Sequence, residues 1–458
     1  MPSESPPRLL IANRGEIAAR IARAARRIGI RTVLAASAAD RDSLAAHEAD
    51  RVVVIGAAPA RDSYLNAPRI MHAAISTECT MLHPGYGFLS EKPDLVELCS
   101  EHGVTFVGPT AESMRRVGDK LSARALANEA GVPLTAGSEK IENAAAALRT
   151  ADKIGYPVIT KASAGGGGRG MVVARSADEL AASFEHASQT AREAFGDGTL
   201  YLERYVERAR HIEVQVVGDG TGRVVHFGER DCSLQRRYQK MIEEAPAPIL
   251  TNDVRQRVRN CAVSLLSRIK YRNAGTVEFL YNEDTQAFSF MEVNARLQVE
   301  HPVSELVTGL DLVEIQLNLA AGRSTPPHQT DIAIRGHAIE VRILAEDPLR
   351  DFLPSPGLIT QWNPPVGPNV RVDTGYSEGS VVTPYYDSML AKLIVHGATR
   401  EEAIERLSAA LESFEIGGIR SNLELLRFIV RHTDYRANRV DTRWLERVLL
   451  PAFRQPKE

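Results

Sequence analysis

Cysteine is scarce in this sequence, and aromatic side chains are few. Four of the 458 residues are cysteine, and Phe, Trp and Tyr together make up 6%. The cysteines show neither metal-ligand spacing nor a disulfide framework: Cys79, Cys99, Cys232 and Cys261. This argues against a disulfide-stapled scaffold and a cysteine zinc site, and it predicts a reduced, cytoplasmic protein.

Long apolar runs and a surplus of basic charge are also missing. No apolar run approaches the ~20 residues that cross a bilayer. The first residues, MPSESPPRLL, lack the basic and apolar regions of a signal peptide. The formal net charge is -3, which gives a nucleic-acid role no support. We therefore expect a globular protein of roughly three domains without membrane or nucleic-acid partners.

The common nucleotide-binding fingerprints are absent as well. In KASAGGGGRGM (161–171), no Lys-Ser or Lys-Thr follows the glycines, so this is not a P-loop. Its glycines match G-x-G-x-x-G, but the residues on both sides predict strands rather than a strand and a helix. A strand–loop–strand hairpin rich in glycine lets backbone lie close over an anion, and Lys161 supplies a positive charge. A merely flexible hairpin tip is the alternative.

The first ~110 residues alternate between strand and helix patterns. This rhythm predicts a parallel, doubly wound α/β sheet, and residues 112–132 predict a further helix. Only Gly15 follows the first strand, so a dinucleotide is not expected there. Arg20, Arg23 and Arg27 share one helix face, which we interpret as a solvated basic face, with a subunit contact or the wall of an anion site as the alternatives.

Two segments with opposed carboxylates predict a magnesium site. TVEFLY (276–281) and FSFMEVN (288–294) read as a hairpin. If Tyr281 pairs with about Ser289, Glu278 falls opposite Glu292, with Asn294 on the same face. A divalent cation would relieve the like-charge conflict, and oxygen ligands suit Mg²⁺. The alternative is that one glutamate faces solvent.

Polar alternation continues beyond this hairpin. Arg296, Gln298 and Glu300 share one face if the strand extends through ARLQVEHP (295–302). Such a group could hold a small planar anion and move its proton, although a surface ion pair looks the same. In HAIEVRILAE (337–346), Glu340 and Arg342 oppose the apolar positions, and an arginine on the wet side is the ordinary alternative.

The chain resembles the biotin carboxylase family from about residue 8 to 445. The resemblance is carried by motifs in the family's order: IANRGEIA, HPGYGFLSE, GDK, KASAGGGGRGM, ERDCSLQRRYQK, EAPAP, EVNARLQVEHP, GHAIEVRILAEDP, FLPSPG and PYYDSM. It implies a mixed α/β fold in three parts. These are an N-terminal Rossmann-like domain (1–118), an ATP-grasp domain (119–325) with a mobile glycine-rich lid (about 135–205), and a C-terminal biotin carboxylase domain (326–450).

The resemblance also implies the chemistry, which is carboxylation of biotin by bicarbonate through carboxyphosphate, with ATP and Mg²⁺ or Mn²⁺. The implied ATP-binding residues are Lys120, Lys161, Gly165, Gly166, Gly167, Gly168, Glu203, His211, Gln235 and Leu280. Bicarbonate would be cradled by Lys240, Arg296, Gln298 and Val299, with Glu300 taking its proton. The metal would be bound by Glu278, Glu292 and Asn294. The biotin side would hold Tyr86, Asp387 and Arg342, which would stabilise the biotin enolate.

The implied partners are a biotin carboxyl carrier protein and carboxyltransferase subunits of acetyl-CoA or another acyl-CoA carboxylase, as in fatty acid biosynthesis. Biotin carriers hold their lysine in Met-Lys-Met, and this tripeptide is absent, so biotin is expected on a separate chain. Departures from the family pattern are Ala164, Tyr238, Leu344 and Arg27. The last replaces an acidic residue at a helix face used for dimerisation, which leaves a homodimer open. Another ATP-grasp carboxylate–amine ligase, or a regulatory nucleotide-binding subunit, would be the alternative function.

Overall fold

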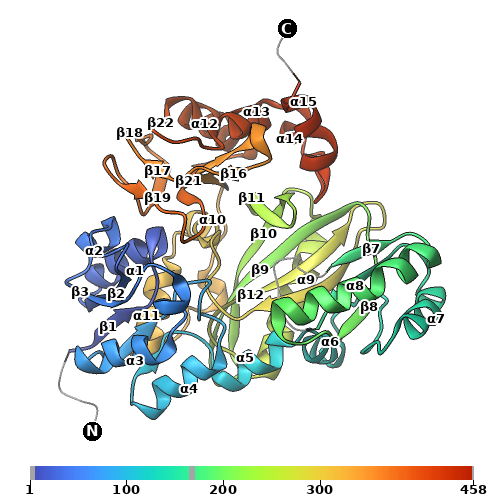
Figure 1. Cartoon of the computed structure of the whole chain (residues 1–458), viewed down its shortest axis with the longest axis horizontal. Helices are drawn as coiled ribbons and strands as arrows, with labels where there is room; N and C mark the ends of the chain where they lie inside the picture. Colours follow the sequence, from blue (N-terminus) through green and yellow to red (C-terminus); the bar gives the residue numbers. More distant parts are fainter. Residues whose placement is uncertain (1–5, 164–170, 456–458) are drawn as a thin grey trace.

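The computed structural model describes residues 6–163 and 171–455 of the chain. Figure 1 shows the N-terminal and C-terminal regions stacked at one side of the molecule, with the central region beside them. Ala164 and the expected ATP-binding glycines Gly165, Gly166, Gly167 and Gly168 lie outside the described residues.

The N-terminal region contains a five-stranded parallel sheet in the order β3-β2-β1-β4-β5. Its strands are β1 (Arg8–Ile11), β2 (Arg31–Ser37), β3 (Arg51–Gly56), β4 (Met81–His83) and β5 (Thr105–Phe106). Its helices are α1 (Gly15–Arg27), α2 (Leu44–Glu48), α3 (Ala67–Ser76), α4 (Pro93–Glu101) and α5 (Ala111–Gly118). Leu10 packs in the core that includes residues of α3 and α4, whereas Leu9 and Ile11 pack in the core formed with α1. Alternate residues thus face opposite helical layers, and the predicted doubly wound sheet is confirmed.

The helix predicted over 112–132 is in fact two helices. α5 ends at Gly118, and α6 (Lys120–Glu129) begins after Asp119. The Asp119 side chain accepts a hydrogen bond from the backbone N–H of Ser122 at 2.8 Å. This cap satisfies an N–H that has no partner within a helix, so a new helix starts here instead of the old one continuing.

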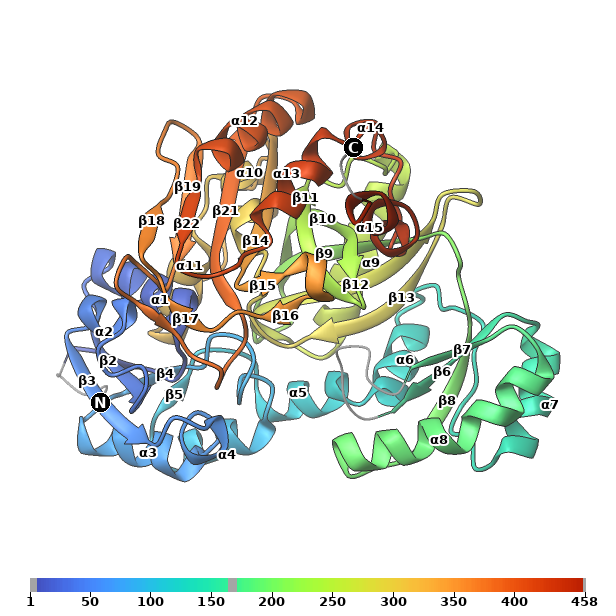
Figure 2. The same ribbon diagram turned by 45° about the horizontal axis from the view of Figure 1, so that its top comes forward.

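The glycine-rich segment joins two strands of a small sheet with the order β7-β6-β8. Its elements are α7 (Ala144–Ile154), β6 (Val158–Ala162), β7 (Val172–Ala174), α8 (Ala177–Phe195) and β8 (Leu200–Arg204). β6 and β7 are antiparallel, which confirms the predicted strand–loop–strand arrangement. In Figure 2 this unit lies at one end of the molecule, away from the N-terminal sheet.

An eight-stranded sheet occupies the middle of the molecule, in the order β13-β12-β9-β10-β11-β14-β21-β19. Its strands are β9 (Ala209–Asp219), β10 (Val224–Arg236), β11 (Gln239–Ala245), β12 (Arg272–Asn282), β13 (Ala287–Asn294), β14 (His337–Leu344), β19 (Val370–Thr374) and β21 (Met389–Gly397). Helices α9 (Asn252–Arg268), α10 (His301–Thr308) and α11 (Leu312–Ala320) belong to the same stretch of chain. Because β11 pairs with β14, the sheet runs without interruption across the division expected near residue 325.

The remaining C-terminal elements complete this region. The helices are α12 (Arg400–Ser413), α13 (Leu423–Arg431), α14 (Thr433–Arg436), a π-helical turn (Leu445–Leu449) and α15 (Leu450–Phe453). Short strand pairs are β15 (Glu346–Asp347) with β16 (Leu353–Pro354), β17 (Gly357–Leu358) with β20 (Val381–Val382), and β18 (Gln361–Asn363) with β22 (Glu415–Gly417). Among the described residues, no helix combines the length and apolarity needed to cross a membrane.

One interpretation of an exposed face is wrong, and one alternative is excluded. Arg20 is buried and pairs with Glu305 at 2.9 Å and Asp311 at 2.7 Å, so it is not part of a solvated basic face. The face of β14 opposite its apolar positions is covered too, and Glu340 has no exposed area. Arg342, which shares that face, is also largely buried, so it is not an arginine on a wet surface. Packing against other regions of the chain buries both faces, which an alternation pattern by itself does not reveal.

Candidate active site

A cavity of about 1000 Å³ opens where the three regions meet. All the predicted site residues that the structure describes line it, except Glu300. They are Tyr86, Lys120, Lys161, Glu203, His211, Gln235, Lys240, Glu278, Leu280, Glu292, Asn294, Arg296, Gln298, Val299, Arg342 and Asp387. Glu300 lies behind the wall, where it contacts Lys240 and Arg342. The structure therefore brings the predicted set together.

The predicted opposition of Glu278 and Glu292 is present, although the register expected for it is not. Leu280 pairs with Ser289, one position from the expected Tyr281 pairing. A bulge between Glu278 and Phe279 then shifts the register, so that Glu278 stands opposite Glu292. β-bulges of this kind re-aim side chains and are common beside active sites.

These carboxylates fit a divalent cation by their chemistry. The Asn294 amide donates to Glu278 at 2.9 Å, and Glu292 lies 3.8 Å from Lys120. Carboxylate and amide oxygens at the wall of a large cavity are ligands that Mg²⁺ accepts together with phosphate oxygens. The cations around Glu278 outweigh the effect of burial and lower its pKa below its ordinary value, so it is ionised.

Lys240 is the centre of the strongest charge cluster. Its Nζ lies 2.6 Å from Glu213, 2.9 Å from Glu278 and 2.6 Å from Glu300. Burial opposes a charge here, but the three carboxylates outweigh burial and raise the pKa of Lys240 well above its ordinary value. The ammonium group thus remains protonated and presents a fixed positive charge at the cavity wall.

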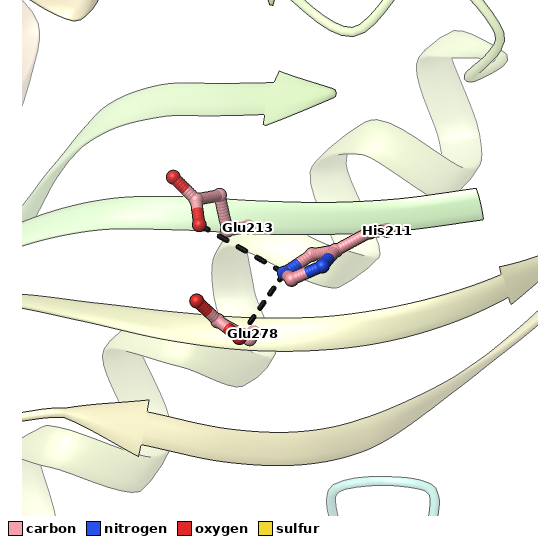
Figure 3. A group of neighbouring side chains, drawn as sticks. All are labelled: His211, Glu213 and Glu278. Carbon is pink, nitrogen blue, oxygen red and sulfur yellow. Dashed lines mark ion pairs between the residues drawn. The ribbon is translucent and has the colours of Figure 1, made fainter. Parts of the chain in front are cut away.

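Glu213 was missed by the sequence analysis. It lies on β9 close to His211, and Figure 3 shows the His211 ring between Glu213 and Glu278, the latter on the neighbouring strand. His211 Nε2 is 3.1 Å from Glu278 and 3.9 Å from Glu213. The signal was present in HIEVQV, where polar His211, Glu213 and Gln215 alternate with buried apolar residues. Lys240 already supplies the cation for Glu213 and Glu278, so this cluster does not require a metal.

The segment after β13 is a loop and not the continued strand that was expected. β13 ends at Asn294, and Glu300 is the residue before the first turn of α10. Arg296 is nevertheless held in place, because it donates to Glu91 at 3.0 Å and to Gln298 at 2.7 Å. Pro302 at the start of α10 favours this helix beginning. The loop therefore brings Arg296, Gln298 and Glu300 together by tertiary contacts rather than by alternation.

Glu300 lies between two cations. Besides Lys240, Arg342 donates to it at 3.1 Å. Burial would favour the neutral acid, but Lys240, Arg342 and Arg230 outweigh burial and lower the pKa of Glu300 well below its ordinary value. The carboxylate is therefore ionised and able to accept a proton from a neighbouring acid.

Arg342 is held by a second carboxylate from the adjacent strand. Glu243 on β11 accepts from Arg342 at 2.7 Å. Burial raises the pKa of Glu243 to about 7, with Arg342 acting in the opposite direction. The guanidinium is thus fixed between Glu243 and Glu300 and faces the cavity.

The remaining predicted residues lie in two groups on the cavity wall, one with Tyr86 and Asp387 and the other with Lys161, Glu203 and Gln235. Tyr86 donates to the buried Glu16, while Asp387 is exposed. Lys161 and Arg124 both pair with Glu203 at 2.6 Å, so the Glu203 side chain is already occupied. On this side His211 also contacts Gln235, at 2.7 Å.

Two of the departures from the family pattern lie at the cavity wall. Tyr238 has a φ of +66° in the turn between β10 and β11, and it is 44% exposed. The Leu344 backbone N–H donates to Asn422 at 2.8 Å. Arg27 is not at this wall, and it pairs within the chain with Asp311 and Glu314, each at 2.5 Å.

Three protein family descriptions match the chain in order. They are "Biotin carboxylase, N-terminal domain" over residues 5–114, "Carbamoyl-phosphate synthase L chain, ATP binding domain" over 119–327, and "Biotin carboxylase C-terminal domain" over 340–447. The central description is that of an ATP-binding domain, in agreement with the expected ATP-grasp fold.

Individual relatives cover nearly the whole chain. Biotin carboxylase 1 of Bacillus subtilis is 47% identical over 96% of this chain and 98% of its own length. The chloroplastic biotin carboxylase of Arabidopsis thaliana is 48% identical over 96% of this chain and 82% of its own. Among solved structures, the biotin carboxylase domain dimer of the Hydrogenobacter thermophilus 2-oxoglutarate carboxylase, in complex with MgADP, ADP and bicarbonate, is 43% identical. It superimposes with a TM-score of 0.94 over 98% of this chain and 99% of that one. The chain belongs to the biotin carboxylase family of ATP-grasp enzymes.

Proposed function

We propose that this enzyme carboxylates biotin with bicarbonate, ATP and Mg²⁺, the biotin being carried on another protein. The observation that carries the proposal is that one cavity joins both halves of the chemistry. Lys240 lies on its bicarbonate side with Glu300 directly behind it, and Arg342 contacts the same Glu300 from the biotin side. A carboxylate–amine ligase would have no use for Arg342 in that position. The family and the bicarbonate and MgADP of the Hydrogenobacter relative support this function.

On the nucleotide side, we assign Lys120 and Lys161 to the phosphates and Glu203, His211, Gln235 and Leu280 to the adenosine. Because Lys161 pairs with Glu203, phosphate binding would compete with that ion pair. Glu278, Glu292 and Asn294 would bind Mg²⁺ or Mn²⁺, which neutralises phosphate charge during phosphoryl transfer. The glycines at 165–168 would close over the phosphates as part of a lid at about 135–205.

On the bicarbonate side, Lys240, Arg296, Gln298 and the Val299 backbone would hold the anion. A bicarbonate oxygen would attack the γ-phosphate, its proton would pass to Glu300, and ADP would leave as carboxyphosphate forms. A bound anion shares the charge of Lys240, which weakens the hold of Lys240 on Glu300. The carboxylate then becomes a better base when it is needed.

On the biotin side, carboxyphosphate would break down to CO₂ and phosphate. The phosphate would take the ureido proton of biotin, and the ureido nitrogen would attack CO₂. Arg342 would stabilise the enolate oxygen, because a positive charge fixed in advance by Glu243 costs no reorganisation. Tyr86 and Asp387 would border the biotin ring.

The wider setting follows from the same assignment. Biotin would arrive on a carrier protein and leave for carboxyltransferase subunits. The final acceptor would be acetyl-CoA, as in fatty acid biosynthesis, or another acyl-CoA.

Two copies would associate as in the Hydrogenobacter dimer. Four unpaired cysteines favour the cytoplasm. The domains would be 1–118, 119–325 and 326–450, close to the matched family ranges.

The test is ADP release with ATP and Mg²⁺, with and without bicarbonate and free biotin. We expect release to require bicarbonate and to be stimulated by biotin. In Glu300→Gln it should fall about 10²- to 10⁴-fold, the usual contribution of a general base. The control is Glu305→Gln, since Glu305 is a buried carboxylate on the adjoining α10 that contacts Arg20 and Arg371 instead of the cavity. ADP release indifferent to biotin, also with a biotinylated carrier, would refute the proposal.

A further inference from the structure

Lys392 is a buried lysine that does not line the cavity. It lies in the middle of β21, in register with Arg342 on one neighbouring strand and Asp373 on the other, and it has no exposed area. A fully buried lysine is rare because removing its charge from water is costly unless the charge is paired. Because it lies beside Arg342, we asked which groups the Lys392 ammonium contacts.

The ammonium group joins the three regions of the chain. Its Nζ donates to the backbone carbonyl of Val299 at 2.8 Å, in the loop before α10. It also lies 3.2 Å from Glu16, at the start of α1 in the N-terminal region. Glu16 in turn accepts from the Tyr86 hydroxyl. One cation thus ties the bicarbonate loop to the loop that carries Tyr86.

The need to neutralise Asp373 does not explain why a lysine is buried at position 392. Asp373 is 3.9 Å from Lys392, but it already has a closer cation, because Arg371 reaches it at 2.6 Å. The contacts that depend on Lys392 among the described residues are therefore the Glu16 carboxylate and the Val299 carbonyl. The second of these belongs to the peptide that joins Val299 to Glu300.

We infer that Lys392 is a positioning residue for bicarbonate: by holding the Val299 carbonyl it fixes the Val299–Glu300 peptide against the cavity. This inference rests on the proposed function for the identity of the anion. Lys392 touches no reacting atom and acts through the loop alone. Groups that hold metal ligands in place change metal affinity or activity about 10- to 100-fold when they are removed, and we expect an effect of the same order here.

The test compares Lys392→Met with the double variant Glu16→Gln/Lys392→Met. The double variant removes both charges of the buried pair, while the glutamine amide introduced at position 16 keeps an oxygen for Tyr86. Both should raise the KM for bicarbonate about 10- to 100-fold, with the KM for ATP little changed. The double variant should regain thermal stability but not the bicarbonate KM, because the Val299 carbonyl still lacks its donor. Arg400→Met is the matched control, since Arg400 is a largely buried cation of the same region that pairs with Glu244.

A readout independent of activity is amide hydrogen exchange over residues 295–303. We expect faster exchange there in both Lys392 variants and not in Arg400→Met. The inference is overturned by an unchanged bicarbonate KM with unchanged exchange, or by a KM restored in the double variant. If Lys392→Met does not fold, the double variant gives both measurements. If the wild type shows no bicarbonate-dependent turnover, the proposed function fails, and the exchange still shows whether Lys392 holds the loop.

Discussion

Glu243 and Glu340 stand directly opposite each other across β11 and β14, and neither has any exposed area. Glu243 is held by Arg342, whereas neither carboxyl oxygen of Glu340 has a hydrogen-bond partner among the described residues. Burial raises the pKa of Glu340 well above its ordinary value, with Lys392 acting against the rise and Glu243 adding to it. Two facing carboxyls beside Arg342 thus avoid repulsion because at least one of them stays protonated.

Glu340→Gln should change the pH dependence of stability. The unfolded chain releases the Glu340 proton near its ordinary pKa, but the folded protein keeps it to higher pH. Folding stability is therefore lost as pH rises from that ordinary value, by about 1.4 kcal/mol for each pKa unit. Relative to wild type, the free energy of unfolding of Glu340→Gln should increase between pH 5 and 8 in urea titrations.

Glu244→Gln is the control for this titration. Burial of Glu244 is outweighed by Arg400, which holds the pKa of Glu244 below its ordinary value. Its contribution is thus constant above pH 5 and is lost only in stronger acid. Parallel pH curves for wild type and Glu340→Gln would show that Glu340 is ionised in the folded protein.

Lys240→Met should destabilise the protein by about 3–5 kcal/mol, as expected when one partner of a buried charge cluster is removed. The loss should be larger at pH 8 than at pH 5, because Lys240 helps to lower the pKa of Glu278 and of Glu300, and without it these carboxylates take up protons more readily in acid. Lys161→Met should cost less, since its partner Glu203 keeps Arg124. Equal losses at both pH values in denaturant titrations would contradict the assigned charges.

Arg342→Lys should affect the carboxylation of biotin more than the activation of bicarbonate by ATP. Lysine keeps a positive charge near Glu243 and Glu300, but it cannot reproduce the planar contacts of the guanidinium. We expect the biotin-stimulated rate to fall about 10²- to 10³-fold while bicarbonate-dependent ADP release without biotin is largely kept. Arg400→Lys, at a buried pair in the same region, should leave the ratio of the two rates unchanged. An equal fall of both rates would place Arg342 on the bicarbonate side alone.

Arg20 and Arg27 lie on the same helix and should differ in their contribution to stability. Arg20 is buried between Glu305 and Asp311, so Arg20→Met should cost about 3–5 kcal/mol. Arg27 is half exposed, so Arg27→Met should cost no more than about 1 kcal/mol despite its two short ion pairs. Thermal unfolding with sedimentation measurements would test both and would also show whether Arg27 affects self-association.

Local patterns in the sequence were informative about the strands and about which residues share a face. The parallel sheet followed from alternating strand and helix signals, and Glu278 was placed opposite Glu292. The register between them was wrong by one residue, because a bulge depends on local packing that alternation does not encode. The bulge follows Glu278 and shifts the register by one residue. This shift offsets the wrong pairing assumed at Tyr281, so Glu278 was still placed opposite Glu292.

What the sequence could not provide were contacts between distant segments. Arg296 depends on Glu91, and Lys392 depends on Glu16 and Val299, across more than 90 residues in each case. Arg20 and Glu340 each lie on the polar face of their element, and alternation does not reveal that another region of the chain covers both faces. Glu213, by contrast, could have been found, since the polar alternation in HIEVQV places it beside His211.

The pairing of β11 with β14 also limits how the gene for this protein could be divided. A break near residue 325 would leave each fragment with an unpaired strand edge, formed by β11 in one piece and β14 in the other. Separately expressed halves should therefore aggregate or remain inactive alone, and co-expression should restore activity by re-forming the sheet. The protein would then serve as a split reporter whose signal requires the two fragments to meet.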